Sequence, residues 1–504
     1  MTRRGFLTSG CAACVGAVGL LAASRPARAA EKMRIRVVYS LHAETQPGPD
    51  WPNVGFEFRP VMDRINATLA NAFPNTTFLP AMATGEEQAK AILSEDASAD
   101  IDGYIAYQMN AWNRVVQTIA TSGKPVLYAD FQYAGSGGFL VYMAAFLRGE
   151  TTNVGFVASS RMEDLIAAVK CFEVVKRGGT TADFVAATAR ARLENTPKPG
   201  DLACLPDKLD VLSAEECIQR MKESLILAVR DQSSGPDGDY AGIPVVKVAF
   251  SELNAAWEAA DKDEARAIAD RWEKTATAVT DVSRETLETS AAMYLGEKAV
   301  LKKYGANAIT INCLGGFYGG HIHAYPCLGF YDLNNQGLIG ACECDVRSTA
   351  TMVTFTTLTK GRPGYISDPV IDTAKRQIIY AHCVASSKVF GPEGSTNPFE
   401  IMTHSEDRQG AAVRSVMPVG YMTTSLEISP ERKEILFHQG KAVDNDPDDR
   451  ACRTKLCAEP VGDIEKLFTQ WDQWGWHRVT FYGNLKEPVF ALADAMGYKV
   501  IEEA

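Results

Sequence analysis

A regular alternation of short apolar runs with amphipathic segments, between residues 33 and 179, constrains the fold of this chain most. The apolar runs are rich in β-branched and aromatic residues, which is typical of strands, and the segments between them have helical spacing. Strands and helices in alternation predict βαβ units and therefore a parallel, doubly wound sheet. The predicted strands are 35–40, 77–81, 103–107, 125–129 and 154–158, and the predicted helices are 58–72, 86–94, 111–121, 139–147 and 162–177.

The remaining sequence divides into two further parts. Residues 180–307 are more helical, and residues 308–504 contain mostly short apolar runs, which is typical of a β-rich module. We therefore predict an α/β protein with doubly wound parallel-sheet domains over residues 30–179 and 180–307. A β-rich C-terminal domain over residues 308–504 follows. The predicted helices of these two parts are 213–227, 251–279 and 284–304, and the predicted strands are 245–250, 308–312, 338–342, 377–382 and 414–417.

The first 29 residues have the pattern of an export signal. Arg3 and Arg4 belong to a twin-arginine motif, an apolar run covers residues 11–23, and Ala27 and Ala29 form a small-residue cleavage pattern. The run is too short to span a bilayer stably, which favours a cleaved twin-arginine signal peptide over a membrane anchor. We expect the mature protein to be periplasmic or secreted.

The formal net charge of −11 limits the class of partner. The signal segment contains four arginines and no acidic residue, so the mature chain is more acidic still. An acidic chain without a basic cluster argues against nucleic acid and anionic membrane surfaces as partners. No long apolar segment follows the signal, so we expect no membrane contact in the mature form. A small molecule is the expected partner.

Ten of the twelve cysteines follow the signal segment. In an oxidising compartment, the shortest disulfide loops would join Cys452 to Cys457 or Cys204 to Cys217. The cysteines in apolar surroundings are expected to be buried thiols instead. These are Cys313, Cys327, Cys342, Cys344 and Cys383.

Two carboxylates, Glu343 and Asp345, follow the apolar run 338–342. Carboxylates at the carboxyl end of a buried strand lie where α/β sheets usually hold ligands. Asp345 is explained equally well as the N-cap of the helical pattern that comes next. Glu343 stands between two cysteines in an apolar setting. Because an unpaired buried carboxylate is costly, we expect Glu343 to be paired, protonated or bound to a metal.

This stretch resembles a known family. Pro326-Cys327-Leu328, then Ala341-Cys342-Glu343 with Asp345, then a Thr-Met helix are similar to the C-terminal part of the L-fucose isomerase / L-arabinose isomerase-like family. The resemblance covers roughly residues 305–504 and concerns only the fold before that. It implies the conversion of aldoses to ketoses with a divalent metal, usually manganese, and a homo-oligomer.

The resemblance also implies a set of metal ligands. The matching positions are Glu343, Asp368 before Pro369, and His477 shortly after a Trp-Gly pair. By resemblance, Glu343 and Asp368 bind the metal and move protons, His477 completes the set, and Asp345 orients a ligand. Carboxylates with one histidine suit Mn²⁺, with Mg²⁺ as the alternative, whereas an all-oxygen site would indicate calcium.

Five histidines call for separate interpretations. His321 and His323 lie in a glycine-rich stretch, where a pair of histidines is more often solvated than metal-bound, and we expect them to line the substrate cleft. His404 lies in a polar stretch and is a candidate for contacting sugar hydroxyls. His382 follows an apolar run and is interpreted as a core histidine, and His438 as a surface residue.

The predicted function is that of a metal-dependent aldose–ketose isomerase that acts through an enediolate. Trp476 stands where fucose isomerases have asparagine, so fucose is not the expected substrate, and the ring is a candidate for stacking on a sugar. Known members of the family act on free sugars in the cytoplasm, so the export signal favours an alternative. That alternative is an exported glycoside hydrolase or lyase with the same metal site. A carbohydrate-binding protein without catalysis is the third hypothesis, which buried carboxylates disfavour.

Overall fold

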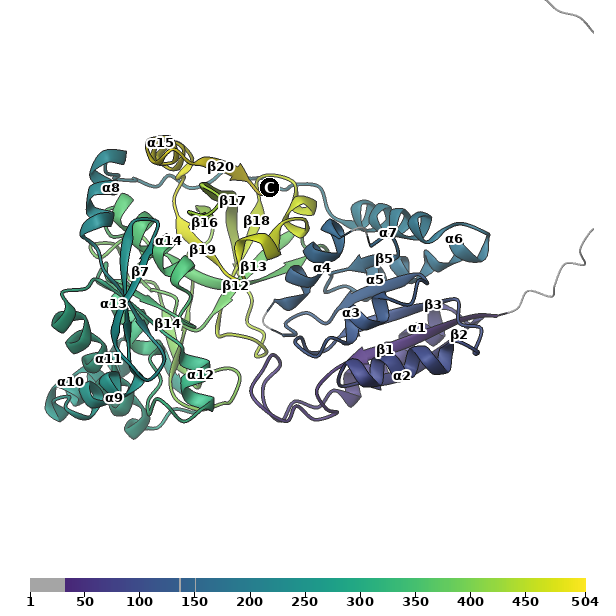
Figure 1. Cartoon of the computed structure of the whole chain (residues 1–504), viewed down its shortest axis with the longest axis horizontal. Coiled ribbons are helices and arrows are strands. Elements are labelled where there is room, and N and C mark those ends of the chain that lie inside the picture. Colours follow the sequence, from purple (N-terminus) through teal and green to yellow (C-terminus); the bar gives the residue numbers. More distant parts are fainter. Residues whose placement is uncertain (1–31, 136, 150) are drawn as a thin grey trace, which may run out of the picture.

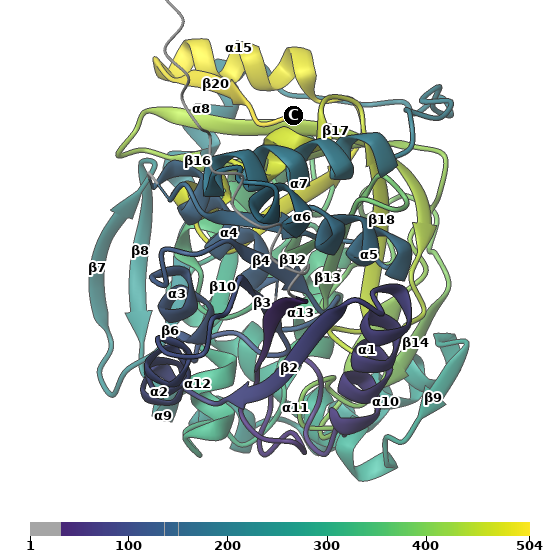
Figure 2. The same ribbon diagram turned by 90° about the vertical axis from the view of Figure 1, so that its right-hand side faces the viewer.

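The computed structural model describes residues 32–135, 137–149 and 151–504. The predicted signal peptide lies outside these residues, and it stays a prediction together with export. Figure 1 shows the N-terminal sheet, in purple and blue, at one end of the molecule and the green and yellow C-terminal part beside it. Figure 2 shows the same N-terminal sheet from its outer side.

The predicted N-terminal parallel sheet is confirmed. Its strands lie in the order β2-β1-β3-β4-β5, and every neighbouring pair is parallel. The central strands β3 and β4 are buried on both faces, which explains their continuous apolar sequences. The strands are β1 (Met33–Ser40), β2 (Thr76–Ala83), β3 (Gly103–Gln108), β4 (Val126–Asp130) and β5 (Val154–Val157). The helices are α1 (Arg59–Ala72), α2 (Glu86–Asp96), α3 (Val115–Ala120), α4 (Gly138–Arg148), α5 (Met162–Lys170), α6 (Phe172–Lys176) and α7 (Thr181–Asn195).

A second sheet has the strand order β11-β10-β6-β8-β7. Its pairs are parallel except for β7 and β8, which form an antiparallel hairpin. The sheet takes strands from both sides of residue 307, because β10 pairs directly with β6. The strands are β6 (Ile226–Val229), β7 (Gly235–Tyr240), β8 (Ile243–Val248), β10 (Ala308–Ile311) and β11 (Ile339–Ala341). The helices around it are α8 (Ala214–Glu223), α9 (Phe250–Glu258), α10 (Lys262–Thr275), α11 (Arg284–Tyr304), α12 (Cys313–Tyr318), α13 (Cys327–Asn335) and α14 (Val346–Leu358).

The C-terminal region is β-rich, as the sequence predicts. Its large sheet has the order β16-β19-β12-β13-β18-β17-β20, and an additional pairing of β16 with β17 closes the sheet on itself. These strands are β12 (Tyr365–Asp372), β13 (Gln377–His382), β16 (Met422–Ser429), β17 (Glu434–Asn445), β18 (Thr454–Pro460), β19 (Arg478–Tyr482) and β20 (Lys499–Glu502). A small sheet contains β9 (Ala278–Thr280), β14 (Phe399–Met402) and β15 (Ala412–Ser415). The remaining helices are η1 (Ile464–Phe468), η2 (Trp471–Trp474) and α15 (Lys486–Met496).

Several element boundaries differ from the sequence prediction. The helix expected over 251–279 is two helices, α9 and α10, because Asp261 starts α10 by accepting hydrogen bonds from the backbone N–H groups of Asp263 and Glu264. The helix expected over 213–227 ends earlier, since Ile226 begins strand β6. In both cases a local apolar pattern continues across a break that polar caps or sheet pairing impose. Among the described residues, no helix is long and apolar enough to cross a membrane.

All ten cysteines among the described residues are free, so neither Cys452–Cys457 nor Cys204–Cys217 forms a disulfide here.

His438 is buried, and its interpretation as a surface residue is wrong. Its strand β17 lies inside the large sheet, and its Nδ1 lies 3.0 Å from Glu503 Oε2.

Glu503 forms a fully buried ionic network near the C-terminus. Arg478 Nη2 donates to Glu503 Oε1 at 2.8 Å, and both side chains have no exposed surface. Burial by itself would raise the pKa of Glu503, but the charges of Arg478 and His438 outweigh it and lower this pKa to about 2. The stabilisation from the ionised carboxylate is therefore present above the unfolded-state pKa of about 4.3 and is lost as pH falls through about 2.

We predict that Glu503→Gln lowers the free energy of unfolding by about 3–5 kcal/mol, because it leaves the Arg478 guanidinium buried without a counter-charge. Chemical denaturation measures the change. Glu502→Gln is the matched control, since Glu502 pairs with Lys486 at 2.7 Å on the surface and its loss costs about 1 kcal/mol or less. Equal losses in the two variants would contradict a structural role for the buried network.

Candidate metal centre

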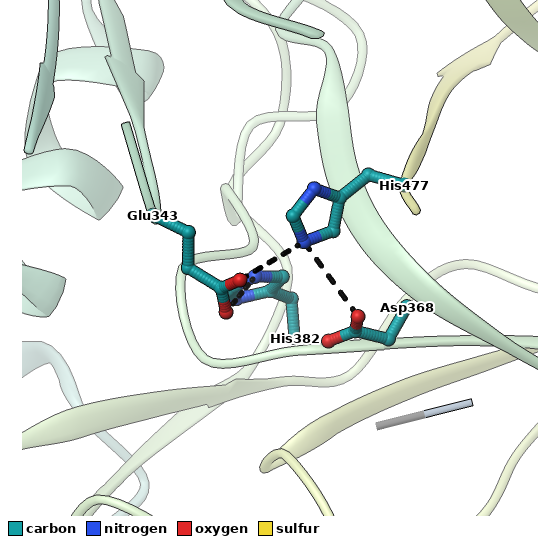
Figure 3. A group of neighbouring side chains, drawn as sticks. All are labelled: Glu343, Asp368, His382 and His477. Carbon is teal, nitrogen blue, oxygen red and sulfur yellow. Dashed lines mark ion pairs between the residues drawn. The ribbon is translucent and has the colours of Figure 1, made fainter. Parts of the chain in front are cut away.

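Four side chains converge where the second sheet meets the large C-terminal sheet. Glu343 follows β11, Asp368 lies within β12, His382 ends β13, and His477 directly precedes β19. Figure 3 shows them pointing toward one another from separate segments of the chain. Each offers one ligand atom, and these atoms all lie within 4.8 Å of one another. The structure thus brings together Glu343, Asp368 and His477, as the resemblance implies, and adds His382.

The distances place His477 between the two carboxylates. His477 Nε2 lies 3.4 Å from Glu343 Oε2 and 3.6 Å from Asp368 Oδ1. His382 Nε2 lies 3.8 Å from Glu343 Oε1. Strand pairing explains the arrangement within the large sheet: Asp368 pairs with Ala381, next to His382, and Ser367 pairs with Arg478, next to His477.

Glu343 reaches the cluster through a strained turn. Glu343 and Cys344 have φ values of 62° and 52°, in the left-handed region that such residues adopt at a cost of about 1–3 kcal/mol each. The turn is fixed on both sides: Cys344 N–H donates to Ile311 O at 2.9 Å, and Asp345 caps helix α14 by accepting from Ser348 N–H at 3.1 Å. The N-cap interpretation of Asp345 is confirmed. Backbone strain of this kind is concentrated at functional positions, and here it occurs at Glu343, whose carboxylate belongs to the four-residue cluster.

Asp345 also orients His477. Its Oδ2 lies 2.9 Å from His477 Nδ1, so the carboxylate accepts a hydrogen bond from this nitrogen. The bond fixes the tautomer in which a neutral His477 ring has a free lone pair at Nε2, directed at Glu343 and Asp368. A carboxylate behind a histidine in this way is the usual arrangement around metal-binding histidines.

The His477 cation is shared by three carboxylates, of which Asp368 is buried and Glu343 and Asp345 are partly buried. Burial lowers the pKa of His477, but the hydrogen bond to Asp345 and the negative charges of Glu343 and Asp368 outweigh it, so that the pKa lies well above its ordinary value. For Glu343 and Asp345, burial raises the pKa, but His477 more than compensates, so both values are lowered, that of Asp345 to about 2. The pKa of Asp368 is raised well above normal by burial and by the charge of Glu343.

Unsatisfied polar atoms mark the centre of the cluster. Asp368 Oδ1, His382 Nε2 and His477 Nε2 are buried, and none has a hydrogen-bond partner among the described residues. Each such atom costs about 1–3 kcal/mol when it stays unpaired. Oxygen and imidazole nitrogen atoms aimed at one point are the donor set of Mn²⁺ or Zn²⁺ sites, and a divalent cation would satisfy Asp368 Oδ1 and His477 Nε2. The residues present therefore fit a divalent metal.

His382 differs from His477 in its hydrogen bonding. Cys383 N–H donates to His382 Nδ1 at 2.9 Å, and burial lowers the pKa of His382 to about 4, so the ring is neutral. In a neutral ring whose Nδ1 accepts, the hydrogen sits on Nε2 and faces Glu343. Metal ligation by His382 would require the ring to give up the bond from Cys383. The interpretation of His382 as a satisfied core histidine nevertheless fails, because its Nε2 has no hydrogen-bond partner among the described residues.

The other predicted substrate contacts lie in different environments. His321 and His323 are exposed and stack on Phe250 and Trp257, outside the four-residue cluster. His404 is buried instead of solvated, with Nδ1 3.4 Å from Asp407 Oδ1. Burial lowers the pKa of His404, but Asp407 and neighbouring charges outweigh it and raise the value to about 9. A sugar-contacting role for these three histidines stays a prediction.

Trp476 joins the centre to the N-terminal sheet. Its ring stacks on Trp112 with centroids 4.4 Å apart. Trp112 lies in the segment after β3 and is 60% exposed, so the stacked pair forms part of the surface beside His477. A sugar-stacking role for Trp476 stays a prediction.

Sequence reasoning missed Glu406. It is buried, and its carboxylate accepts a hydrogen bond from the Tyr318 hydroxyl at 2.9 Å. Burial raises the pKa of Glu406 to about 7, and the charges of Asp50 and Glu343 contribute, which places Glu406 near the centre. Its backbone oxygen accepts from Val54 N–H at 2.8 Å, so the loop after β1 closes over this region. No local pattern around Glu406 distinguishes it from a surface glutamate.

Comparison with known proteins finds sugar isomerases at low identity. No protein-family model matches the chain. The sulfoquinovose isomerase of Clostridium sp. (strain MSTE9) is 24% identical over 232 residues, which is 44% of this chain and 50% of that enzyme. The sulfoquinovose isomerase of Priestia aryabhattai is 25% identical over 143 residues, 27% of this chain and 31% of that enzyme. The chain thus spans about half or less of the length of these curated relatives.

Solved structures add no argument about the fold. The transcription regulator CcpA of Lactococcus lactis covers 64% of this chain and 92% of its own, but with 11% identity and a TM-score of 0.16. The XylFII–LytSN complex gives a TM-score of 0.17. At such values the two architectures are not shown to be the same. The relationship to sugar isomerases therefore depends on sequence similarity together with the four-residue cluster.

We predict that His477→Gln weakens Mn²⁺ binding at least about tenfold, and that His382→Gln weakens it less, because only His477 has its free lone pair fixed by a carboxylate. Titration calorimetry on metal-stripped protein measures the affinities. His323→Gln serves as the control, since His323 is exposed and lies outside the cluster. Unchanged affinity in His477→Gln would exclude this metal centre, and a greater loss in His382→Gln would contradict the tautomer assignment.

A second expected outcome is ligand-linked stability. If Mn²⁺ binds only the folded chain, saturating metal at about 100 times its Kd should raise the free energy of unfolding by about 2.7 kcal/mol. Differential scanning calorimetry with and without Mn²⁺ measures this gain, and His477→Gln should lose it. A gain that persists in His477→Gln would place the bound metal elsewhere.

Proposed function

We propose that the chain is a metal-dependent aldose–ketose isomerase whose reaction takes place at Glu343, Asp368 and His477. The observation that carries this proposal is the convergence of the partly buried Glu343, the buried Asp368 and two histidines. Asp368 Oδ1 and both histidine Nε2 atoms lack hydrogen-bond partners among the described residues. The similarity to sulfoquinovose isomerases supports the same reaction class. It also suggests that a sulfonated aldose belongs among the substrates to be tested.

The reaction needs a base and an acid near two adjacent carbons. A divalent metal bound at the cluster would polarise the substrate carbonyl as a Lewis acid and make the neighbouring C–H more acidic. Glu343, whose pKa is held low by His477, is suited to accept the proton from carbon. Asp368, whose pKa is raised by burial, is suited to hold a proton and deliver it to the other carbon or oxygen. Environments that push two carboxyl pKa values apart are the usual basis of such a pair.

The surroundings supply positioning and exclusion of water. Asp345 holds the His477 ring, and the Thr351 hydroxyl of helix α14 donates to the buried Glu427 of strand β16. We propose that Trp112 and Trp476 offer an apolar surface to a sugar ring at the edge of the site. Export by the twin-arginine route is part of the proposal, and it implies an extracytoplasmic source of the sugar.

The test is direct incubation of purified protein and Mn²⁺ with free aldoses, a sulfonated aldose among them, and with glycosides. NMR of the products distinguishes isomerisation from bond cleavage. In deuterated water, an isomerase with a carboxylate base should place deuterium at C1 or C2 of the product. Cleavage of a glycoside without ketose formation would replace this proposal with the hydrolase or lyase alternative.

We predict that Glu343→Gln lowers kcat by about 10²–10⁴-fold while the circular dichroism spectrum stays unchanged, because the amide cannot accept the proton. Glu434→Gln is the control. Glu434 forms an ion pair with Arg432, with 3.0 Å between the two side chains, and it is not part of the cluster. Wild-type turnover in Glu343→Gln would remove this residue from the reaction.

A further inference from the structure

A cavity of about 130 Å³ lies at the carboxyl ends of the N-terminal strands, apart from the metal centre. Its lining includes Tyr107 from the end of β3, Asp130 from the end of β4, and Arg161 from the segment between β5 and α5. Arg64 of α1 and Arg450 of the loop between β17 and β18 complete the polar wall. In doubly wound sheets, this edge is where ligands bind.

Three arginines from distant parts of the sequence surround the cavity. Two are held in place by neighbours: Arg450 Nη2 donates to Asp448 Oδ2 at 2.6 Å, and Arg161 Nη2 donates to Asp164 Oδ1 at 2.7 Å. The Arg450 guanidinium also lies 4.9 Å from the centre of the Phe131 ring, which restricts its plane. Arg64 is exposed to solvent and, among the described residues, makes no ion pair and donates no side-chain hydrogen bond, so its guanidinium is available to a ligand.

A buried carboxyl group, that of Asp130, also faces the cavity. It is 9% exposed, lines the cavity, and makes no side-chain hydrogen bond among the described residues. Burial raises its pKa to about 8, with a further contribution from Asp372, against the lowering effect of Arg450. At neutral pH the carboxyl is therefore protonated and acts as a donor instead of neutralising the arginines.

The cavity consequently presents mainly hydrogen-bond donors. Arg161 and Arg450 are already paired with carboxylates, so the net positive charge comes from Arg64. Because each water occupies about 30 Å³ in the liquid, a cavity of about 130 Å³ has room for roughly four water-sized groups, which suits a small anion. We propose that this cavity binds a small hydroxylated organic anion, with a carboxylate or sulfonate held by Arg64 and Arg450 and hydroxyl groups at Asp130 and Tyr107. Bidentate guanidinium contacts favour such planar or forked oxyanions.

The site is separate from the metal centre but connected to it. Ser160 N–H, at the cavity, donates to Asp372 Oδ1 at 3.0 Å. Asp372 ends the strand β12 that contains Asp368, and four residues of strand correspond to about 13 Å. An anion bound in the cavity would therefore lie next to the hydrogen bond that joins Ser160 to the end of β12. The proposal does not depend on the isomerase activity.

The test is calorimetric titration of the full mature chain with D-glycerate and with sulfate, and with glycerol as the neutral control. Neither anion changes its charge between about pH 6 and about pH 9, so any pH dependence belongs to the protein. We expect both anions to bind at about pH 6 and glycerol not to bind. Absence of anion binding at millimolar concentration would overturn the proposal.

Variants locate the binding. Arg64→Gln should weaken it at least tenfold, whereas Arg59→Gln on the same helix, paired with Glu44, should change it less than twofold. Glu343→Gln should leave it unchanged, and a loss of binding in that variant would place the anion at the metal centre instead. Equal affinity in Arg64→Gln and the parent chain would also overturn the proposal.

The pH dependence of anion affinity tests the contact with Asp130, because a purely structural role of Asp130 would not change it. The charged or titratable groups around Asp130 are Arg64, Tyr107, Tyr128, Arg161, Asp372 and Arg450. Because ionised Asp130 repels an anion, affinity should fall as pH rises through about 8. Asp130→Asn should abolish this fall, since the amide stays neutral. A fall that persists in Asp130→Asn would contradict the assigned contact.

Discussion

The hydrogen bond between Asp345 and His477 determines the chemistry of the site. It fixes which nitrogen of His477 faces Glu343 and Asp368. The negative charge of Asp345 also raises the pKa of His477 and so favours its protonated form when no metal ion is bound. Three carboxylates around one imidazole, of which Asp368 is buried and Glu343 and Asp345 are partly buried, repel one another unless a cation stands between them. The unsatisfied Nε2 and Oδ1 atoms show where that cation belongs. A divalent metal answers both the electrostatic and the hydrogen-bonding requirement.

The fold serves this constraint by joining two sheets. Glu343 comes from the end of the second sheet, and Asp368, His382 and His477 come from neighbouring strands of the large C-terminal sheet. The strained turn at Glu343 is fixed because Cys344 bonds to β10 and Asp345 caps α14. The site therefore depends on the packing of whole sheets, and small shifts between them would separate the ligand atoms.

The same reasoning relates the N-terminal sheet to the rest of the chain. Its carboxyl edge faces the C-terminal region through the Trp112–Trp476 stack and through the bond from Ser160 to Asp372. We therefore infer that the N-terminal sheet contributes to the surroundings of the metal centre. A sugar at the metal centre and an anion at the cavity would both lie along strand β12.

The sequence by itself determined the parallel N-terminal sheet, because strand and helix periodicities are local and alternate without ambiguity. It also indicated Glu343, since a carboxylate between buried thiols has no inexpensive structural explanation, and family resemblance added Asp368 and His477. It did not reveal His382, Glu406 or the buried His438, whose neighbours in the chain look ordinary. Only the tertiary structure decided these, because burial, the tautomer of each histidine and the shared cation arise from contacts between residues far apart in sequence.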